Sequence, residues 1–167
     1  MFDLFCPWLY EKDVYSIKYE ELYSQGFRGI VFDIDKTLVY QGEDATEEVI
    51  QLIDNIKQIG FKIVLVSNNQ YKRVSTFANK LQVPYINSAE KPSKRGFLNA
   101  LEIMELKKEQ VFCVGDQIFT DVWGANRCGV NCILVKYLKK QHVLGLFSIK
   151  RCLEKMLICY FKSKNLI

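Results

Sequence analysis

Acidic side chains stand at or just after the ends of two stretches of the sequence that we expect to be buried strands. Asp33 and Asp35 follow the apolar run 29–32, and Asp116 follows a second run that ends at Val114. Because side chains alternate along an extended chain, Asp33 and Asp35 are expected to point the same way. Three converging carboxylates repel one another, so such a site needs a cation. Oxygen ligands favour Mg²⁺ over zinc, and we expect Mg²⁺ as the cofactor.

Two further polar side chains lie where other predicted strands end. Ser67 follows the apolar run 62–66, and Lys91 lies in the loop after a short strand at 85–86. In an open parallel sheet, ligands bind at the edge formed by the carboxyl ends of the strands. A single Asp at a strand end is ordinarily a turn or helix cap. The set of five polar residues at one sheet edge favours a catalytic site instead.

The segments between these residues alternate between strand-like and helix-like patterns. Apolar runs without alternation indicate strands buried on both faces. The expected strands are 29–32, 62–66, 85–86, 110–114 and 131–135, and the expected helices run from a Ser16 cap to Tyr23, from Thr46 to Ile59, and over 71–81, 95–104 and 118–127. This order predicts an α/β fold, a Rossmann-like parallel sheet covered by helices on both faces.

Charge is divided unevenly along the chain. The 167 residues carry a formal net charge of +4, with 49% hydrophobic and 25% charged residues, which is typical of a globular protein. Residues 1–135 hold 15 Lys or Arg against 18 Asp or Glu, whereas residues 136–167 hold 8 against 1. This distribution excludes a uniformly basic nucleic-acid-binding protein. We expect a single catalytic domain over 1–147 and a basic C-terminal helix or tail over 148–167.

Hydropathy and cysteine content predict the cellular context. No stretch approaches the roughly 18–20 apolar residues of a membrane-spanning helix. The N-terminal segment carries Asp3 and lacks a basic start, so it does not have the pattern of a signal peptide. Six scattered cysteines and one histidine, His142, do not make a zinc pattern, and His142 is expected at the surface. We expect a reduced, cytoplasmic protein.

Four motifs, in order, resemble those of the haloacid dehalogenase (HAD) phosphatase superfamily. They are the DxDxT pattern at 33–37, Ser67 at the end of VLVS, Lys91 in AEKP, and Asp116 of the GD pair with Asp121. One such motif is a weak signal, but four in order on alternating strands form a specific one.

Within that superfamily, the chain most resembles the YqeG-type phosphatases of subclass IIIA. The segments FDIDKTLV and VGDQIFTDVWGANRCG carry this similarity, which runs from about Pro7 to Glu154 and includes the pattern Arg151-x-x-Glu154. The family includes phosphatidylglycerophosphate phosphatases. Lys36 is a departure, because the family commonly has Asn at this position.

The resemblance implies a phosphomonoester hydrolase that forms an aspartyl-phosphate on Asp33. Asp35 would protonate the leaving alkoxide and later activate water, and its main-chain carbonyl would bind Mg²⁺. The implied metal ligands are Asp33, Asp35 and Asp116. Ser67 and Lys91 would hold the oxygens of the transferring phosphoryl group.

Three residues have supporting roles in this scheme. Thr37 would fix the turn that carries both aspartates. Asp121 would act near the metal through water, or it would cap the following helix at Val122, and both interpretations stay open. Asn68 would shape a turn or contact the substrate.

The spacing of the motifs leaves no room for a cap domain. Thr37 and Ser67 are separated by 29 residues, and Ser67 and Lys91 by 23. A domain of about 50 residues or more does not fit either gap. We therefore expect a capless HAD fold whose open site admits bulky phosphates, such as lipid head groups, proteins or nucleic-acid ends. Phosphatidylglycerophosphate is the substrate that the resemblance favours.

The end of the sequence combines apolar and basic side chains. A stripe at helical spacing indicates a terminal helix docked on the sheet, with the members Ile149, Cys152, Leu153, Met156, Leu157 and Tyr160. The basic residues of the tail could also meet an anionic leaflet, helped by the apolar residues Phe161, Leu166, Ile167, Phe2, Leu4, Phe5, Trp8 and Leu9. This predicts peripheral contact at the inner face of a membrane. No nucleic acid is expected as a partner, because few aromatic residues interleave with the charges of the tail.

Two alternatives to this function stay open. One is a phosphatase for another exposed phosphate, on a sugar, nucleotide or protein. The other is a non-enzymatic phospho-acceptor switch of the receiver type, which gathers the same residue types at a sheet edge. Receivers carry the acceptor on a middle strand, whereas Asp33 is expected on the first strand of the sheet. An inactive binding module is disfavoured, because Asp33, Asp35 and Asp116 are all intact.

Overall fold

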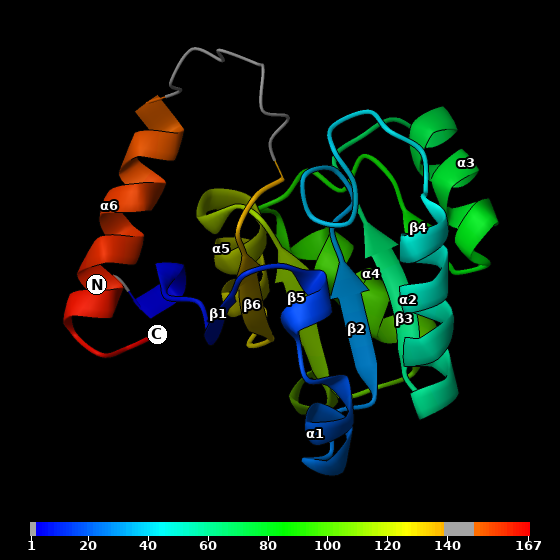
Figure 1. Cartoon of the computed structure of the whole chain (residues 1–167), viewed down its shortest axis with the longest axis horizontal. Coiled ribbons are helices and arrows are strands. Elements are labelled where there is room, and N and C mark those ends of the chain that lie inside the picture. The colour runs from blue at the N-terminus through cyan, green and yellow to red at the C-terminus, as the bar shows by residue number, and fades with distance from the viewer. Residues whose placement is uncertain (1–2, 139–148) are drawn as a thin grey trace.

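The fold is built on one parallel sheet. A computed structural model of the chain describes residues 3–138 and 149–167. Its strands are β1 (Leu9–Glu11), β2 (Gly29–Phe32), β3 (Lys62–Val66), β4 (Tyr85–Ile86), β5 (Val111–Gly115) and β6 (Asn131–Val135). They form a 6-stranded sheet in the order β1-β6-β5-β2-β3-β4 (Figure 1). Every pair of neighbouring strands is parallel, as the uninterrupted apolar runs predict.

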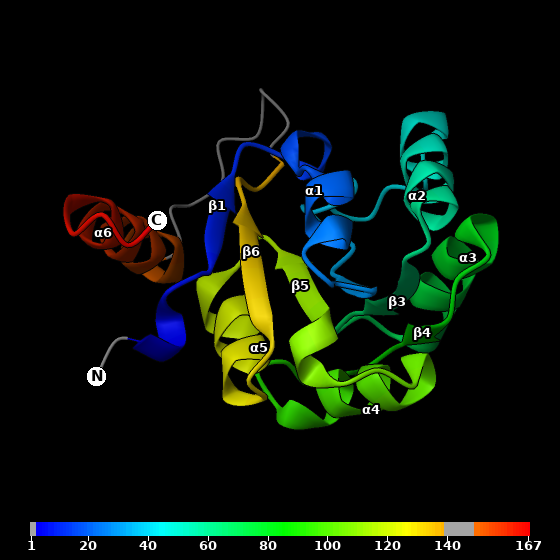
Figure 2. The same cartoon turned by 90° about the horizontal axis from the view of Figure 1, so that it is seen from below.

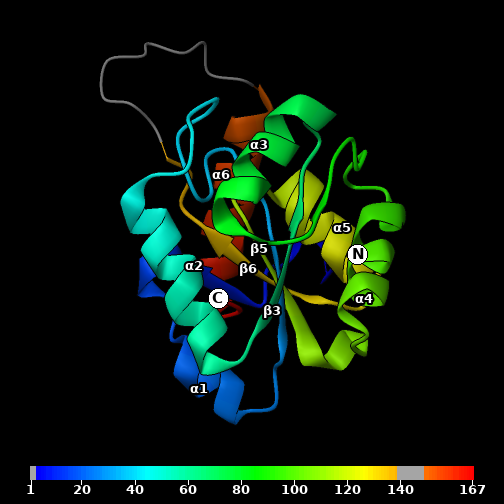
Figure 3. The same cartoon turned by 90° about the vertical axis from the view of Figure 1, so that its right-hand side faces the viewer.

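Helices cover both faces of the sheet. The helices α1 (Tyr19–Ser24), α2 (Glu47–Ile59) and α3 (Tyr71–Leu81) lie on one face, and α4 (Lys94–Met104) and α5 (Trp123–Arg127) lie on the other (Figures 2 and 3). Helix α6 (Ile149–Ser163) lies beyond the edge strand β1 (Figure 2). Short 3₁₀ helices occur at Asp3–Phe5, Val14–Ser16 and Lys108–Gln110, and a π-helical turn occurs at Ile118–Val122. The predicted Rossmann-like α/β fold class is confirmed.

The core has two apolar layers, one on each face of the sheet. Ile30 and Phe32 of β2 belong to the layer under α1, α2 and α3, whereas Val31 belongs to the layer under α4 and α5. All four residues of β2 are buried. This double burial explains why the central strands are apolar throughout.

Helix α2 shows how local sequence sets an element's bounds. Thr46 is its N-cap, and the Oγ1 atom of Thr46 accepts a hydrogen bond from the backbone N–H of Val49 at 3.3 Å. Gly60 ends the helix with a φ of 115°, a left-handed conformation that favours glycine. Both bounds agree with the sequence-based expectation.

The start of the chain differs from that expectation in two ways. Strand β1 was not predicted, because it has only three residues and includes Glu11. Ser16 does not cap α1: Lys18 occupies the N-cap position, and Ser16 donates from both N–H and Oγ to Asp13 Oδ1 at 2.9 and 2.8 Å.

The extra strand also changes where Asp33 stands in the sheet. Strand β2, which Asp33 follows, is the second strand of the chain, and it lies between β5 and β3 inside the sheet. The expectation that Asp33 ends the first strand is therefore wrong, and strand position gives no argument against a receiver-type switch.

The aromatic residues near the N-terminus pack on the body of the protein. The ring of Trp8 lies 5.2 Å from that of Phe27, and the ring of Phe5 lies 5.6 Å from that of Phe119. Leu9 is part of β1. These residues do not form a free apolar arm, which corrects the membrane role expected of them. Phe2 lies outside the described residues.

Helix α6 docks on the body with a different face from the one predicted. Its buried residues are Glu154 and Phe161, at 3% and 1% exposure. Leu157 is partly buried, but the other members of the predicted stripe are exposed, namely Ile149, Cys152, Leu153, Met156 and Tyr160. Phe161 therefore does not leave the body as expected. His142 and the predicted domain boundary at 147/148 lie outside the described residues. Within those residues, no helix combines the length and the apolar character needed to cross a bilayer.

We predict that Trp8→Ala lowers the free energy of unfolding by about 2 kcal/mol, because a half-buried ring loses its packing against Phe27 and the adjoining strand. Leu4→Ala, at a side chain 45% exposed, is the matched control and should change stability by less than about 0.5 kcal/mol. Urea denaturation followed by circular dichroism measures both. If Trp8→Ala changed the free energy of unfolding as little as Leu4→Ala does, the N-terminal strand would not be part of the cooperatively folded unit.

Candidate active site

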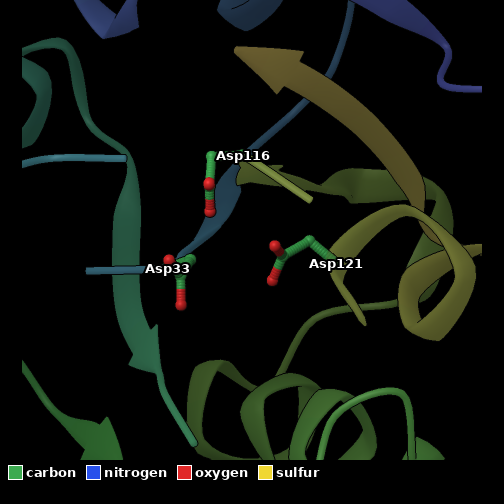
Figure 4. Close-up of side chains that lie close together, drawn as sticks. All are labelled: Asp33, Asp116 and Asp121. Atoms are coloured by element: carbon green, nitrogen blue, oxygen red, sulfur yellow. The ribbon is translucent and has the colours of Figure 1, made fainter. Parts of the chain in front are cut away.

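Three of the predicted site residues stand at the carboxyl ends of neighbouring strands. Asp33, Ser67 and Asp116 follow β2, β3 and β5, which are adjacent in the order β5-β2-β3. Asp33 and Asp116 converge there with Asp121 from the π-helical turn (Figure 4). One oxygen of each of these three carboxylates lies within 4.8 Å of the others. The sequence predicted that Asp33 and Asp116 lie together at this edge of the sheet, and it left two interpretations of Asp121 open.

The three carboxylates are buried together, which disfavours the ionised forms of Asp33 and Asp116. Asp33, Asp116 and Asp121 are 8%, 4% and 1% exposed. Burial, followed by the nearby charges of Asp121 and Asp116, raises the pKa of Asp33 to about 7, although Lys91 acts against this rise. Burial and the charge of Asp121 raise the pKa of Asp116 to about 6, and Arg151 opposes that change.

Lys91 supplies one cation inside the cluster. Its Nζ atom donates to Asp33 Oδ1 at 2.5 Å and to Asp121 Oδ1 at 2.6 Å, and its side chain is only 4% exposed. Burial alone would lower the pKa of Lys91, but the two carboxylates raise it above its usual range. The ammonium group is therefore held charged between the two acids.

Asp116 keeps one oxygen without a hydrogen-bond partner. Its Oδ2 contacts the guanidinium of Arg151, and its main-chain oxygen accepts from Arg151 Nη1 at 2.9 Å. Its Oδ1 is buried, and no donor among the described residues reaches it. A bare carboxylate oxygen beside two further carboxylates fits a divalent cation with a preference for oxygen ligands. The acidic triad is thus a candidate metal site.

The carboxylate of Asp35 lies outside this triad. Its Oδ1 accepts from Gly42 N at 2.7 Å and from Arg73 Nη2 at 3.1 Å, and its Oδ2 contacts Asn69 Nδ2. The chain turns directly after Asp33, where the carbonyl of Ile34 accepts from Leu38 N at 2.9 Å. Strand alternation therefore does not continue to Asp35, and the two aspartates do not share one cluster as expected.

The turn that follows Asp33 is shaped by two further residues. Thr37 is buried, and its Oγ1 donates to Asp33 Oδ2 at 3.2 Å, which holds the aspartate as well as the turn. Lys36 has a φ of 68°, a left-handed conformation that Asn tolerates better than Lys. That conformation gives a physical reason for an Asn at this position in the family that the sequence resembles.

Asn68 holds the backbone of Lys91. The Oδ1 of Asn68 accepts from Lys91 N at 2.7 Å, and its Nδ2 donates to Lys91 O at 3.2 Å. Ser67 is 2% exposed, and its Oγ accepts from the N–H of Asn69 at 3.2 Å. The position of the Lys91 ammonium thus depends on the loop after β3.

Gly115 allows Asp121 to join the site. A Cβ atom at position 115 would lie 2.4 Å from both Cβ and Cγ of Asp121, which is too close for atoms that are not bonded to each other. Asp121 Oδ2 accepts from Gln117 N at 3.2 Å, so the carboxylate also closes the loop that it belongs to. The structure therefore places Asp121 in the cluster, with Lys91, and not in a capping role at Val122.

Three side chains of the site make contacts that the sequence did not predict, although Asn69, like Asn68, was expected to shape a turn or contact the substrate. Asn69 and Arg73 hold the carboxylate of Asp35, and Arg151 holds Asp116. The Arg151-x-x-Glu154 pattern was the available signal for Arg151, but nothing in the spacing linked it to Asp116. Ion pairs between distant segments have no local sequence pattern.

Comparisons with known proteins give the family. The haloacid dehalogenase-like hydrolase family matches residues 41–129. The chain is 40% identical over 132 residues to the probable phosphatase YqeG of Bacillus subtilis, a match that covers 78% of this chain and 77% of that protein. It is 28% identical over 145 residues to the chloroplastic phosphatidylglycerophosphate phosphatase 1 of Chlamydomonas reinhardtii, covering 81% of this chain and 54% of the relative.

Solved structures share the fold at low identity. An uncharacterized protein from Listeria monocytogenes superposes with a TM-score of 0.56 at 17% identity, covering 81% of this chain and 99% of that chain. A predicted phosphoglycolate phosphatase from Haemophilus somnus superposes with a TM-score of 0.54 at 15% identity, covering 71% and 89%. The expected enzyme class, a phosphatase, is confirmed by the family and by relatives that bear this name. The chain belongs to the haloacid dehalogenase-like hydrolases.

Proposed function

We propose that the protein is a Mg²⁺-dependent phosphomonoester hydrolase that works through an aspartyl-phosphate on Asp33. The observation that carries this proposal is the position of Asp33 at the end of a central strand, in a buried acidic triad beside the ammonium of Lys91. A cation bound by the carboxylates of Asp33 and Asp116 would neutralise the cluster and polarise the phosphate. The carbonyl of Asp35 is the third ligand in this proposal.

In the proposed first step, Asp33 attacks phosphorus and the bond to the ester oxygen breaks. Asp35 gives its proton to the departing alkoxide, and an acyl phosphate forms on Asp33. Water then attacks that phosphorus, Asp35 takes a proton from it, and free phosphate and the Asp33 carboxylate are restored. The contacts of Gly42 and Arg73 hold the Asp35 side chain apart from the triad, which suits a separate acid–base role.

Ser67 and Lys91 are proposed to bind the phosphoryl oxygens. Lys91 Nζ lies 2.5 Å from Asp33 Oδ1, so it is already beside the carboxylate that would bond to phosphorus. Positive charge at that position stabilises the transition state, where negative charge develops on those oxygens. Asn68 would act through Lys91, since it holds the backbone of that residue from both sides.

We predict that Asp33→Asn lowers kcat on an aryl phosphate by about 1,000-fold or more, because the amide cannot act as the nucleophile. Asp54→Asn, on the outer side of α2, is the control and should leave kcat unchanged. Release of the chromogenic phenol in Mg²⁺ measures both rates. Stoichiometric phosphorylation of the wild-type protein without turnover would contradict the enzyme and support a receiver-type switch.

The raised pKa values predict that Mg²⁺ stabilises the protein more at high pH. In the folded chain, the pKa of Asp33 is raised to about 7 and that of Asp116 to about 6, against an ordinary value of 3.8. In the metal-free protein, the stability that their protonation contributes is complete below about pH 4 and is lost as the pH rises through about 6 to 7. Mg²⁺ must displace protons at low pH and meets free carboxylates at high pH.

The rise in melting temperature on adding Mg²⁺ should therefore be larger at about pH 8 than at about pH 5. Differential scanning fluorimetry with and without Mg²⁺ measures this difference, and Asp33→Asn should reduce it. A shift of the same size at both pH values would contradict a metal bound by these carboxylates.

We further propose that the substrate is a lipid phosphomonoester, with phosphatidylglycerophosphate as the first choice. The two segments between Thr37 and Ser67 and between Ser67 and Lys91 hold only loops, α2, β3, α3 and β4, so neither contains an inserted domain that would cover the site. The relative from C. reinhardtii carries this substrate in its name. In this proposal, the catalytic site belongs to a single domain over 1–147, and the basic C-terminal helix or tail over 148–167 is attached to that domain.

The exposed side of α6 supports peripheral contact with an anionic membrane at its cytoplasmic face. Ile149 and Met156 are 81% and 63% exposed, and Leu153 lies between them at 46%. Residues 136–167 hold 8 basic residues against 1 acidic one. Apolar and basic side chains together suit an interfacial helix. All cysteines are free, as in a reducing compartment.

We predict that phosphatidylglycerophosphate in mixed micelles is hydrolysed with a kcat/KM about tenfold or more above those of soluble sugar, nucleotide and peptide phosphates.

The double substitution Leu153→Ser and Met156→Ser should weaken binding to phosphatidylglycerol vesicles by about tenfold, through lost apolar burial. Leu98→Ser, on α4 and 44% exposed, is the matched control. Soluble esters that outcompete the lipid would overturn the lipid assignment, and unchanged vesicle binding would overturn the role of α6.

A further inference from the structure

The first turn of α6 reaches a carboxylate of the acidic triad. Arg151 contacts Asp116 Oδ2 through Nη2, and its Nη1 donates to the main-chain oxygen of Asp116 at 2.9 Å. The carboxylate of Asp116 has no exposed surface, and the side chain of Arg151 is 19% exposed. One guanidinium thus holds a side-chain atom and a main-chain atom of the same residue.

This double contact fixes the direction in which Asp116 presents its other oxygen. Oδ2 is occupied by Arg151, whereas Oδ1 is buried and has no donor among the described residues. An oxygen of Asp116 lies within 4.8 Å of ligand atoms of Asp33 and Asp121. A guanidinium can make two such bonds in a fixed plane, which the point charge of an ammonium cannot do.

Arg151 is itself held by its surroundings. Its Nη1 also donates to Glu154 Oε2 at 3.0 Å, and its guanidinium lies 4.6 Å from the centre of the Tyr137 ring. Glu154 is 3% exposed, and its Oε1 accepts from Phe119 N at 3.4 Å. Lys150 adds a contact from Nζ to Gln117 Oε1 at 2.7 Å. The start of α6 is thereby anchored to the loop that carries Asp116.

We propose that Arg151 is a positioning residue for the divalent cation: it orients Asp116 so that Oδ1 is available as a metal ligand. This inference rests on the proposed function, since it requires a cation at the triad. It assigns to the C-terminal helix a part in metal binding, through a residue that does not itself touch the metal.

If Arg151 affected the site through its charge alone, its removal would change the metal affinity in the opposite direction. A guanidinium near the site repels a second cation, so its removal would then tighten metal binding. Orientation of a ligand by a neighbouring hydrogen-bond partner acts in the other direction, and loss of such partners typically weakens metal affinity by about 10–100-fold. The sign of the change therefore separates the two effects.

The test measures Mg²⁺ affinity by isothermal titration calorimetry of the full chain without substrate. Arg151→Gln should weaken binding about tenfold or more, and Arg151→Lys should restore the charge but not the affinity. Lys164→Gln removes the same charge at an exposed position of the tail and should change the affinity by less than about twofold.

A second variant guards against unfolding of the docked helix. Glu154→Gln keeps Arg151 and an acceptor for Phe119 N, and it should weaken Mg²⁺ binding less than Arg151→Gln does. Circular dichroism of each metal-free variant checks the helix content. Unchanged or tighter binding in a folded Arg151→Gln protein would overturn the positioning role alone. A wild-type chain that binds no divalent cation would overturn the proposed function and this inference together.

Discussion

The repulsion among buried carboxylates at the carboxyl edge of the sheet governs the arrangement of the site. Asp33, Asp116 and Asp121 lie close together with little access to water, and burial together with the charge of Asp121 makes Asp33 and Asp116 harder to ionise. Lys91 offsets this repulsion for Asp33 and Asp121, and Arg151 offsets it for Asp116. The cluster still lacks positive charge, since two cations face three acids and one buried oxygen has no donor.

The two cations come from segments far from the acids in the sequence. Lys91 is held by the side-chain amide of Asn68, at the end of β3, and Arg151 is held by Glu154 within α6. Removing one partner of such a buried set leaves another charge unpaired, which is costly. The site is therefore also a set of long-range contacts that joins α6 and the loop after β4 to the central strands.

The sequence was most informative where a residue's role follows from its place on one element. Strand β2 is buried on both faces and is apolar throughout, so the strand and the edge position of Asp33 were both predictable. The short strand β1 offers no such pattern, and Asp121 reaches the triad only because a π-helical turn follows Gly115.

Helix α6 shows the limit of hydrophobic periodicity most clearly. The apolar stripe correctly indicated a helix, but it selected the wrong face for docking. Arg151 and Glu154 turn toward the loop of Asp116, and Met156 turns toward solvent. A periodicity argument counts apolar groups alone, so it cannot register a polar interface formed by ion pairs. Only the fold brings these partners together.

The most direct test of the account is the location of the bound cation. In crystals grown with Mn²⁺ in place of Mg²⁺, we expect one anomalous difference peak at the triad, within direct bonding distance of an oxygen of Asp33 and of Oδ1 of Asp116. Arg151 should remain on Oδ2 of Asp116 in that structure. A peak elsewhere, or no peak at the triad at saturating Mn²⁺, would contradict the claim that this carboxylate cluster is a metal-dependent catalytic site.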